Sequence, residues 1–594
     1  MCGIAGYVGT RRIEEERLRH CLQLMHRRGP DHGAWREFEP AAGRRVYLLN
    51  TRLDIIDLHE RANQPLSVGP LTITYNGELY NYLELRRELE ARGERFATAS
   101  DTEVLVRLLG TDGLGALDRS EGMWAFALYD ETDGRIVLAR DRFGEKPLYV
   151  HRGADGLTFA SEPKFVAALL GRRLDVDFEQ VRRFLGSGYR SLYKDGRTFF
   201  RELEEVPAAT TVSIAADGSE SAAAYWSPAH GEQDAMGYEE AVRGARDRLI
   251  RSVELRLRAD VPLAFCLSGG VDSTVLISIA RRVLGHDVHG FTVVTGDERY
   301  DESDAVEQTV ADLAIRHTKV PLESHDFLSR LRELVCYHDA PVYTVSYYVH
   351  SRLMEAVARG DYRVSVSGTG ADELFTGYYD HHLAYLAVTR DEGARAAWEQ
   401  HVLPLVRNEA LRDPDLFVRD RAFRGHLYDG VDPASFTERE LSGDLLRNRM
   451  LNELIDEVVP VILHEDDLNA MYYSIENRSP YLDRSLADFC NTIPTRHLIR
   501  DGFAKAVLRD AGRGIAPDHV VAARRKVGFN APVAELLDAD DAGVRGALLA
   551  DNPVFDLVDR DWFERLLTKR PLADRENKLL FSIVSAMLFL EEFA

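Results

Sequence analysis

Cys2 stands directly behind the initiator methionine in the opening stretch MCGIAGYVGT. A short apolar cysteine can simply begin a buried strand. If Met1 is removed, however, Cys2 carries a thiol and a free α-amine on one residue. Because an α-amine titrates near pH ~7.7–8.0 and a thiol near ~8.5, the amine can serve as the base that activates the thiol. These ten residues alone leave both interpretations open.

The stretch LSGGVDST is a second candidate for chemistry, because an apolar segment runs into two glycines and then into an expected helix. Gly269 and Gly270 allow close backbone approach, and a helix N-terminus offers unpaired N–H groups, so this turn suits a polyphosphate. Ser268 and Ser273 can donate hydroxyl hydrogen bonds. Asp272 fits an anion site only beside a cation, and Mg²⁺ prefers a carboxylate together with phosphate oxygens. A tight turn with a capping serine would explain the glycines but not Asp272.

Lysine usage is the third signal. Only eight of the 74 basic residues are lysine, so this chain rarely uses lysine as a solvated surface charge. Lys505 in AKAVLR and Lys526 in RRKVGF nevertheless keep lysine. A compact ammonium offers a different geometry from the guanidinium fork of arginine. Any lysine in this chain, these two included, is therefore less readily explained as a solvated surface charge.

The elements that must position these residues change in character along the chain. The N-terminal third is rich in short apolar segments bounded by Gly, Asp or Asn, which predicts packed sheets. Apolar residues that recur three and four apart predict helices at 82–92 and 101–109. The segments expected as strands in this third are 45–49, 71–75, 124–129 and 135–140.

A loose stretch rich in Ala, Ser, Gly and Asp at 215–235 is expected to separate two domains. Beyond it, strands expected at 263–267, 288–294 and 363–367 alternate with helices, which predicts a parallel α/β sheet. The predicted parts are a first domain at 2–210, a linker at 211–236 and a second domain at 237–594, mostly helical beyond about residue 384.

Length and composition limit the classes of protein. At 594 residues, 45% of them apolar, the chain has the composition of a globular protein and is too long for one core. A net charge of −23 argues against nucleic acid or an anionic membrane as partner. No long apolar run occurs, so we expect neither a secretory signal nor a membrane span. Five cysteines without CxxC pairs predict a reduced, cytoplasmic protein with no zinc site.

Cys2-Gly3-Ile4 and LSGGVDST together carry a resemblance to a known family. The loop resembles the pyrophosphate-binding loop of ATP pyrophosphatases, which adenylate a substrate oxygen and release pyrophosphate. With the N-terminal cysteine ahead of it, nearly the whole chain is similar to class II amidotransferases of the glutamine-hydrolysing asparagine synthetase type. The resemblance implies an Ntn-hydrolase-type glutaminase domain of stacked β-sheets, then an α/β ATP-pyrophosphatase domain with a parallel sheet and a helical C-terminal part. It also implies ATP and Mg²⁺ as cofactors, glutamine and a carboxylate acceptor as further ligands, and a homodimer.

In the first domain the resemblance implies a glutamine site. Cys2 takes the place of the family nucleophile, and Arg52 in TRLDIIDL that of the arginine which holds the glutamine carboxylate. Asn76 and Gly77 in YNGELYN match the oxyanion hole, whose donors are each typically worth ~10²–10³ in rate. Taken one at a time, each of these could be a turn residue or a solvated charge. The remaining residues implied for glutamine binding are Glu78 and Asp101.

In the second domain the resemblance implies an ATP site at the glycine-rich loop. Asp272 and Asp372 match two metal-binding carboxylates, and Lys526 matches the lysine that stabilises developing charge around the adenylate. Glu302 is a further candidate for a polar role near the nucleotide. The residues implied for ATP binding are Leu267, Ser268, Gly269, Gly270, Asp272, Ser273, Val293, Ser367, Gly368 and Lys505, with Thr369 and Glu373 in the acceptor pocket.

Two departures from the family pattern leave the acceptor open. The chain reads SGTGADE, with Thr369 where the family usually has an acid, and Ala340 replaces a second acid. The α-ammonium of aspartate requires a carboxylate, and a hydroxyl cannot supply that charge. Either Glu302, Glu373 or Asp380 compensates and the acceptor is aspartate, or the acceptor is a different carboxylate, on a sugar or a specialised metabolite.

The leading prediction is a glutamine-dependent asparagine synthetase, which forms asparagine, glutamate, AMP and pyrophosphate from glutamine, aspartate and ATP. One alternative keeps this chemistry and changes only the acceptor. A catalytically silent scaffold is an alternative of another class, against which the nearly complete set of reactive positions argues. An ATP pyrophosphatase that modifies tRNA would leave the whole Cys2 domain unexplained.

Overall fold

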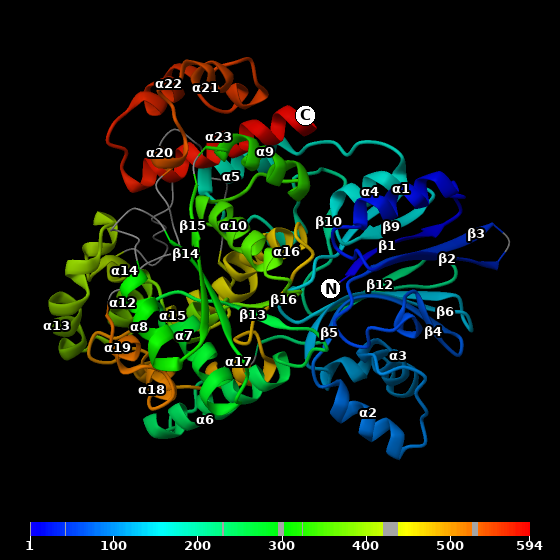
Figure 1. The fold of residues 1–594 in the computed structure, drawn as a ribbon, viewed down its shortest axis with the longest axis horizontal. Coiled ribbons are helices and arrows are strands. Elements are labelled where there is room, and N and C mark those ends of the chain that lie inside the picture. Colours follow the sequence, from blue (N-terminus) through cyan, green and yellow to red (C-terminus); the bar gives the residue numbers. More distant parts are fainter. Residues whose placement is uncertain are drawn as a thin grey trace.

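The computed structural model places two halves side by side, with the N-terminal half at the right of Figure 1 and the larger C-terminal half at the left. The strands and helices predicted in both halves are present, with ends shifted by at most four residues. The structure describes residues 2–41, 43–228, 231–294, 302–323, 325–419, 438–524 and 533–594.

The N-terminal half is built on two six-stranded antiparallel sheets. In spatial order, the first consists of β10 (Glu204–Glu205), β8 (Tyr149–Gly153), β9 (Gly156–Ala160), β1 (Cys2–Gly9), β3 (Arg44–Arg52) and β2 (His32–Ala41). The second consists of β12 (Glu220–Ala224), β11 (Thr210–Ile214), β7 (Arg135–Arg140), β6 (Gly122–Asp130), β5 (Leu71–Leu79) and β4 (Leu66–Val68).

The alternation of side chains along these strands explains how the sheets stack. Ile4 and Leu48 point from the first sheet into a core shared with Ala127 and Leu138 of the second sheet. Their neighbours along each strand point outward, because successive side chains of a strand lie on opposite faces. Helices α1 (Glu15–Met25) and α4 (Pro163–Leu170) cover the outer face of the first sheet, and α2 (Tyr82–Ala91) and α3 (Asp101–Asp112) that of the second. The result is a four-layer αββα stack, which confirms the stacked-sheet fold predicted for this half.

The segment predicted as a linker contains the last two strands of this stack. β11 pairs with β7, and β12 pairs with β11, in place of the linker expected from residue 211. The prediction misread this stretch because the β12 sequence, ESAAA, is exposed at every residue and shows no apolar alternation. An edge strand with one neighbour can be polar and small and still be paired through its backbone.

The C-terminal half is built on a five-stranded, fully parallel sheet, as predicted. The chain adds β14 and β15 on one side of β13 and then returns to add β16 and β17 on the other. The order therefore reverses between β13 and β16, and ligands of such sheets bind at the carboxyl ends of the strands at this point. In spatial order the strands are β15 (Arg316–Pro321), β14 (His289–Val294), β13 (Leu263–Cys266), β16 (Val364–Val366) and β17 (Glu476–Arg478).

Helices pack on both faces of the parallel sheet. Phe265 faces α6 (Tyr238–Arg256), whereas its neighbour Ala264 faces α10 (Val345–Arg359) and α16 (Val459–Met471). The long helix α23 (Asp574–Phe593) packs on α5 and α9 and joins the two halves. The other helices are α5 (Phe178–Ser187), α7 (Val271–Ser278), α8 (Ser303–Leu313), α9 (Phe327–His338), α11 (Ala371–Phe375), α12 (Tyr379–Thr389), α13 (Glu392–His401), α14 (Leu416–Arg419), α15 (Leu445–Asn452), α17 (Arg484–Cys490), α18 (Ala506–Gly512), α19 (Asp518–Val521), α20 (Val533–Leu536), α21 (Ala542–Leu548) and α22 (Arg560–Thr568).

Among the described residues, no helix combines the length and the apolar character that a bilayer span requires.

Candidate functional site

The residues predicted for glutamine binding come together where the two stacked sheets of the N-terminal half meet. Cys2 begins β1 and is paired with Arg52 of β3 in the first sheet. Asn76 lies on β5 of the second sheet, and its Oδ1 accepts a hydrogen bond from the Cys2 backbone N–H at 3.0 Å. The Asn76 Nδ2 group is buried and meets no acceptor within the described ranges. An unsatisfied buried donor beside the thiol is the property that an oxyanion hole requires.

Gly77 and Asp101 hold the β5 side of this site in place. A Cβ at Gly77 would lie 2.1 Å from the carbonyl oxygen of Met123, so only glycine lets β5 approach β6 this closely. The Asp101 carboxylate accepts a hydrogen bond from the Leu79 N–H at 2.9 Å through Oδ2, and it is buried. Both residues therefore fix the position of β5, the strand that carries Asn76.

Arg52 has a fixed orientation. Its Nη1 donates to the His59 carbonyl at 3.2 Å and to Asn63 Oδ1 at 3.1 Å, and the same nitrogen pairs with Asp54 Oδ1 at 2.9 Å. Its Nη2 donates to the Ile56 carbonyl at 3.1 Å. The loop that follows β3 therefore fixes the orientation of the guanidinium. A substrate carboxylate would have to compete with Asp54 for this group.

Glu78 contacts a residue that the sequence did not connect with the first site. Arg478, on β17 of the other half, places Nη2 3.8 Å from Glu78 Oε2. Burial, reinforced by the neighbouring Glu476, raises the pKa of Glu78 well above its ordinary value. Arg478 and Glu476 belong to the stretch IENRSPYLD. This stretch therefore reaches from the parallel sheet to the glutamine site.

The protonation of Cys2 follows from its burial. Only 6% of Cys2 is exposed, and burial raises the pKa of its thiol, although Arg52 opposes the rise. A buried thiol is therefore protonated at neutral pH and needs a base before it can attack a substrate. The α-amine of the same residue is the base that its position offers once Met1 is removed.

A buried ionic network lies between the two halves, directly behind Cys2. Arg28 Nε donates to the Cys2 carbonyl at 3.1 Å, and Nη1 pairs with Glu162 Oε1 at 2.8 Å and with Asp467 Oδ2 at 2.7 Å. Lys146 Nζ lies 3.3 Å from Asp467 Oδ1. Asp467 lies on α16 of the C-terminal half, so this network ties the strand of Cys2 to that helix. The prediction from sequence missed Asp467, because no motif in HEDDLNAM marks it.

The predicted nucleotide loop lies at the reversal point of the parallel sheet. It follows β13, and α7 begins at Val271. The Oγ atoms of Ser268 and Ser273 are 3.0 Å apart, and Gly270 N donates to Ser268 Oγ at 3.2 Å. Gly269 N donates to Glu302 Oε2 at 3.2 Å. A carboxylate oxygen thus occupies the position of an anion at this loop, as expected if the loop amides bind phosphate.

Asp272, in the first turn of α7, and Asp372, in the first turn of α11, converge on one lysine. Lys505 Nζ lies between them, 2.6 Å from Asp272 Oδ2 and 2.5 Å from Asp372 Oδ1. Burial disfavours the ammonium, but the two carboxylates outweigh it and raise the pKa of Lys505 to about 12. Two carboxylates that converge on one cation also suit Mg²⁺, so the residues fit the metal that was predicted here.

The backbone around this cluster is unusually constrained. Lys505 has a φ of 57°, in the left-handed region that a residue with a side chain rarely adopts. A Cβ at Gly377 would lie 1.5 Å from Asp372 Oδ1, so this carboxylate occupies the space of a missing side chain. Strain and close approach of this kind gather at sites where geometry matters more than stability.

The other residues predicted for ATP surround the loop. Ser367 and Gly368 follow β16, and a Cβ at Gly368 would lie 3.1 Å from Asp272 Cβ. Leu267 and Val293 lie at the carboxyl ends of β13 and β14. The structure thus places the residues predicted for ATP binding at or beside the carboxyl edge of the parallel sheet. Lys526, predicted as catalytic, lies outside the described residues.

Comparison with known proteins agrees with this geometry. A family model described as asparagine synthase matches residues 244–591, and one described as a glutamine amidotransferase domain matches residues 1–226. Asparagine synthetase [glutamine-hydrolyzing] 1 of Bacillus subtilis is 30% identical over 90% of this chain and 87% of its own length. The chain belongs to the asparagine synthase family. It is therefore an ATP-dependent ligase of the class that takes nitrogen from glutamine.

Two further relatives show the range of names in this family. A putative asparagine synthetase of Mycobacterium bovis is 30% identical over 91% of this chain and 89% of its own length. A protein named amidase chry2, from Gibberella zeae, is 29% identical over 64% of this chain and 59% of its own length.

Thr369, where this chain departs from the asparagine synthase pattern, has an acidic partner that the sequence did not reveal. Its Oγ1 donates to Asp466 Oδ2 at 2.9 Å. Asp466 comes from α16, 97 residues further along the chain. Two adjacent acids in HEDDLNAM thus point to different sites, Asp466 to Thr369 and Asp467 to Arg28.

The three acids predicted to compensate for Thr369 have other partners. Glu302 accepts from Gly269 N, as described above. Glu373 accepts from the Tyr378 hydroxyl at 2.6 Å, and burial together with Asp372 raises the pKa of Glu373 to about 7. Asp380 pairs with Arg449 at 2.5 Å. Asp466 rather than any of these is the acid bound to Thr369.

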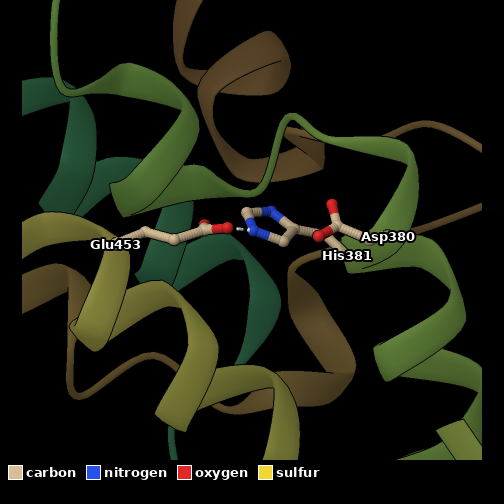
Figure 2. A group of neighbouring side chains, drawn as sticks. All are labelled: Asp380, His381 and Glu453. Carbon is tan, nitrogen blue, oxygen red and sulfur yellow. Dashed lines mark hydrogen bonds and ion pairs between the residues drawn. The ribbon is translucent and has the colours of Figure 1, made fainter. Parts of the chain in front are cut away.

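Asp380, His381 and Glu453 form a buried group whose ligand atoms lie close enough to suggest a metal site (Figure 2). His381 Nε2 is 2.6 Å from Glu453 Oε2, and His381 Nδ1 accepts from the Gly377 N–H at 3.2 Å. Both ring nitrogens are therefore already engaged. Arg190 pairs with Glu453 at 3.0 Å, just as Arg449 pairs with Asp380. This group is an ion-pair cluster that supports α12 and α15, and we assign no metal to it.

Proposed function

We propose that this member of the asparagine synthase family is a glutamine-hydrolysing asparagine synthetase that acts through two cooperating sites. The observation that carries the proposal is the position of α16, which binds both sites. Asp467 on this helix pairs with Arg28, which in turn binds the Cys2 carbonyl, and the adjacent Asp466 binds Thr369 beside the nucleotide loop. One rigid element thus sets the position of the nitrogen-releasing thiol relative to the acceptor.

In the first site, the α-amine of Cys2 takes the thiol proton and the sulfur attacks the side-chain carbonyl carbon of glutamine. Asn76 Nδ2 and the Gly77 backbone stabilise the oxyanion, and Arg52 and Asp101 hold the α-carboxylate and α-amine of glutamine. Ammonia leaves with the proton returned by the amine, and water then hydrolyses the thioester to release glutamate. Because ammonia becomes inert once protonated, it has to cross between the halves without entering bulk water.

In the second site, an oxygen of the acceptor carboxylate attacks the α-phosphorus of ATP, and the bond to pyrophosphate breaks. Ser268, Gly270 and Ser273 would hold the pyrophosphate, and Lys505 and Lys526 would balance its charge. Asp272 and Asp372 would hold Mg²⁺, which would supply further positive charge against the phosphates. Ammonia then attacks the acyl carbon, AMP leaves, and a proton is lost to give the amide.

Mass spectrometry with glutamine labelled with ¹⁵N in the side-chain amide tests this function. With ATP, Mg²⁺ and aspartate, we expect labelled asparagine together with equal amounts of AMP and pyrophosphate. ADP and phosphate as products, or full activity in protein that retains Met1, would contradict the proposal.

A second candidate keeps this chemistry and changes the acceptor. Thr369 in place of an acid, and the similarity to a protein named amidase, favour testing it. A panel of carboxylates, including sugar acids, in the same assay would show it through labelled amide formed from a compound other than aspartate.

A further inference from the structure

Asp466 is a buried acid at the acceptor end of the nucleotide site. We propose that Asp466 binds the α-ammonium group of an amino-acid acceptor and so determines the acceptor class, in place of the acid that Thr369 lacks. This inference rests on the proposed function and adds to it the residue that selects the substrate.

The described polar contacts of Asp466 are a hydroxyl, a side-chain amide and one histidine. Thr369 Oγ1 donates to Oδ2 at 2.9 Å, and Asn477 Nδ2 lies 3.5 Å from the same oxygen. His350 Nδ1 is 3.7 Å from Oδ1. No lysine or arginine pairs with this carboxylate in the part of the chain that the structure describes. Asp466 is only 7% exposed. A buried carboxylate that has no lysine or arginine partner gains from a cation that arrives with the ligand.

The position of Asp466 places such a cation next to the chemistry. Asn477 Nδ2 also donates to Ser367 Oγ at 3.2 Å, so Asp466, Ser367 and Thr369 form one hydrogen-bonded group. Gly368, between Ser367 and Thr369, packs against Asp272 of the nucleotide loop. An α-ammonium at Asp466 would therefore bind to the hydrogen-bonded group that adjoins the nucleotide loop through Gly368.

Thr369 and Asp466 are a matched pair. A hydroxyl at position 369 orients Asp466 by donating to it, whereas a glutamate there would place a second negative charge against a buried one. Burial already raises the pKa of Asp466, so a second acid would be costly. The two positions should therefore show strong energetic coupling in a double-mutant cycle.

The experiment measures pyrophosphate release by the full-length protein with aspartate and with succinate, which lacks only the ammonium group. For Asp466→Asn we expect kcat/KM for aspartate to fall about 30-fold or more relative to succinate, mainly through KM, as for loss of one partner of a buried charge pair. Glutaminase activity should stay within about twofold, which also shows that the variant is folded. Asp361→Asn, the same change at an exposed residue, is the control and should leave the ratio unchanged.

A double variant gives a second test, because recovery of aspartate use is not expected if Asp466 has only a structural role. Thr369→Glu alone should lower aspartate use, and Thr369→Glu combined with Asp466→Asn should restore a large part of it, because one acid is then present again. Thr369→Val, which removes only the orienting hydroxyl, should shift the aspartate-to-succinate ratio in the same direction as Asp466→Asn but by less.

Three outcomes overturn the inference. They are an unchanged ratio in Asp466→Asn, an equal loss for aspartate and succinate, and no rescue by the double variant. These outcomes differ from failure of the proposed function, in which the unaltered protein forms neither AMP nor pyrophosphate with any carboxylate.

Discussion

The two sites of this protein satisfy their polar groups in opposite ways. At the glutamine site, the Asn76 side chain is held by Cys2 while its buried Nδ2 stays without an acceptor. At the nucleotide site, Lys505 neutralises Asp272 and Asp372 within a buried cluster. The oxyanion donor of the first site is therefore available to its substrate, although Arg52 has to exchange Asp54 for the substrate carboxylate, whereas both acids and the lysine of the second site have to exchange internal ion pairs for ligand contacts. We conclude that the oxyanion donor Asn76 is preorganised and that the nucleotide site rearranges when it binds.

The difference follows from the elements that carry the residues. Cys2, Arg52 and Asn76 lie on strands whose register is set by many backbone hydrogen bonds. Asp272 and Asp372 lie in the first turns of α7 and α11, just after two separate strands, and Lys505 precedes α18. Loops that follow strands can adjust to a ligand more easily than strands within a sheet.

Removal of the Cys2 thiol should have the largest effect, because it should abolish the activity of the glutamine site and leave that of the nucleotide site. For Cys2→Ala we expect glutamine-dependent amide formation to fall by at least about 10³-fold, because no other residue can form the thioester. Ammonium chloride should still support AMP release at nearly the original rate, since the nucleotide site is intact. Loss of both activities would show that the sites are not separable.

Loss of the oxyanion donor tests whether the glutamine site is preorganised. Asn76→Ala should lower glutaminase kcat by about 10²–10³-fold with a much smaller change in KM, as expected for a donor that acts in the transition state. Asn552→Ala, far along the chain in the turn before Val554, is the matched control. An effect confined to KM would mean that Asn76 binds glutamine and does not stabilise the oxyanion.

Neutralising one acid at the nucleotide site tests the rearrangement. Asp372→Asn should lower AMP formation by about 10²-fold and raise the Mg²⁺ concentration needed for half-maximal rate, while glutaminase activity is retained. Calorimetric titration with MgATP gives a readout independent of turnover. Unchanged Mg²⁺ dependence would indicate that Asp372 serves only as a partner of Lys505.

The smallest expected effect is the loss of stability in acid at Glu205, which pairs with Arg140 in its own half and with His464 in the other half. Burial opposes ionisation of Glu205, but Arg140 and His464 outweigh it and lower its pKa to about 2 from an ordinary value near 4.5. A depressed pKa contributes stability that is present above the ordinary value and is lost as pH falls toward about 2. We expect a loss of up to about 3 kcal/mol over this window. Melting temperatures of the unaltered protein and of Glu205→Gln should converge as pH falls from 5 to 3, and parallel curves would contradict this.

Sequence motifs predicted much of the fold and many of the site residues of this protein. The packed sheets of the first half and the parallel sheet of the second followed from local sequence patterns. The stacked-sheet fold and the family followed from the resemblance carried by the N-terminal cysteine and the glycine-rich loop. The edge strand β12 was missed since its backbone pairing needs no apolar pattern. Arg478 and Asp467 were missed because their partners, Glu78 and Arg28, lie 400 and 439 residues away.

The sequence by itself determined the family, the reaction class and most of the groups gathered at each site. It also identified Thr369 as the departure that leaves the acceptor in question. Only the tertiary structure showed that Asp466 binds Thr369 and that α16 contacts both sites. The physical reason is that a buried charge is defined by what surrounds it, and those neighbours come from distant parts of the chain that only folding brings together.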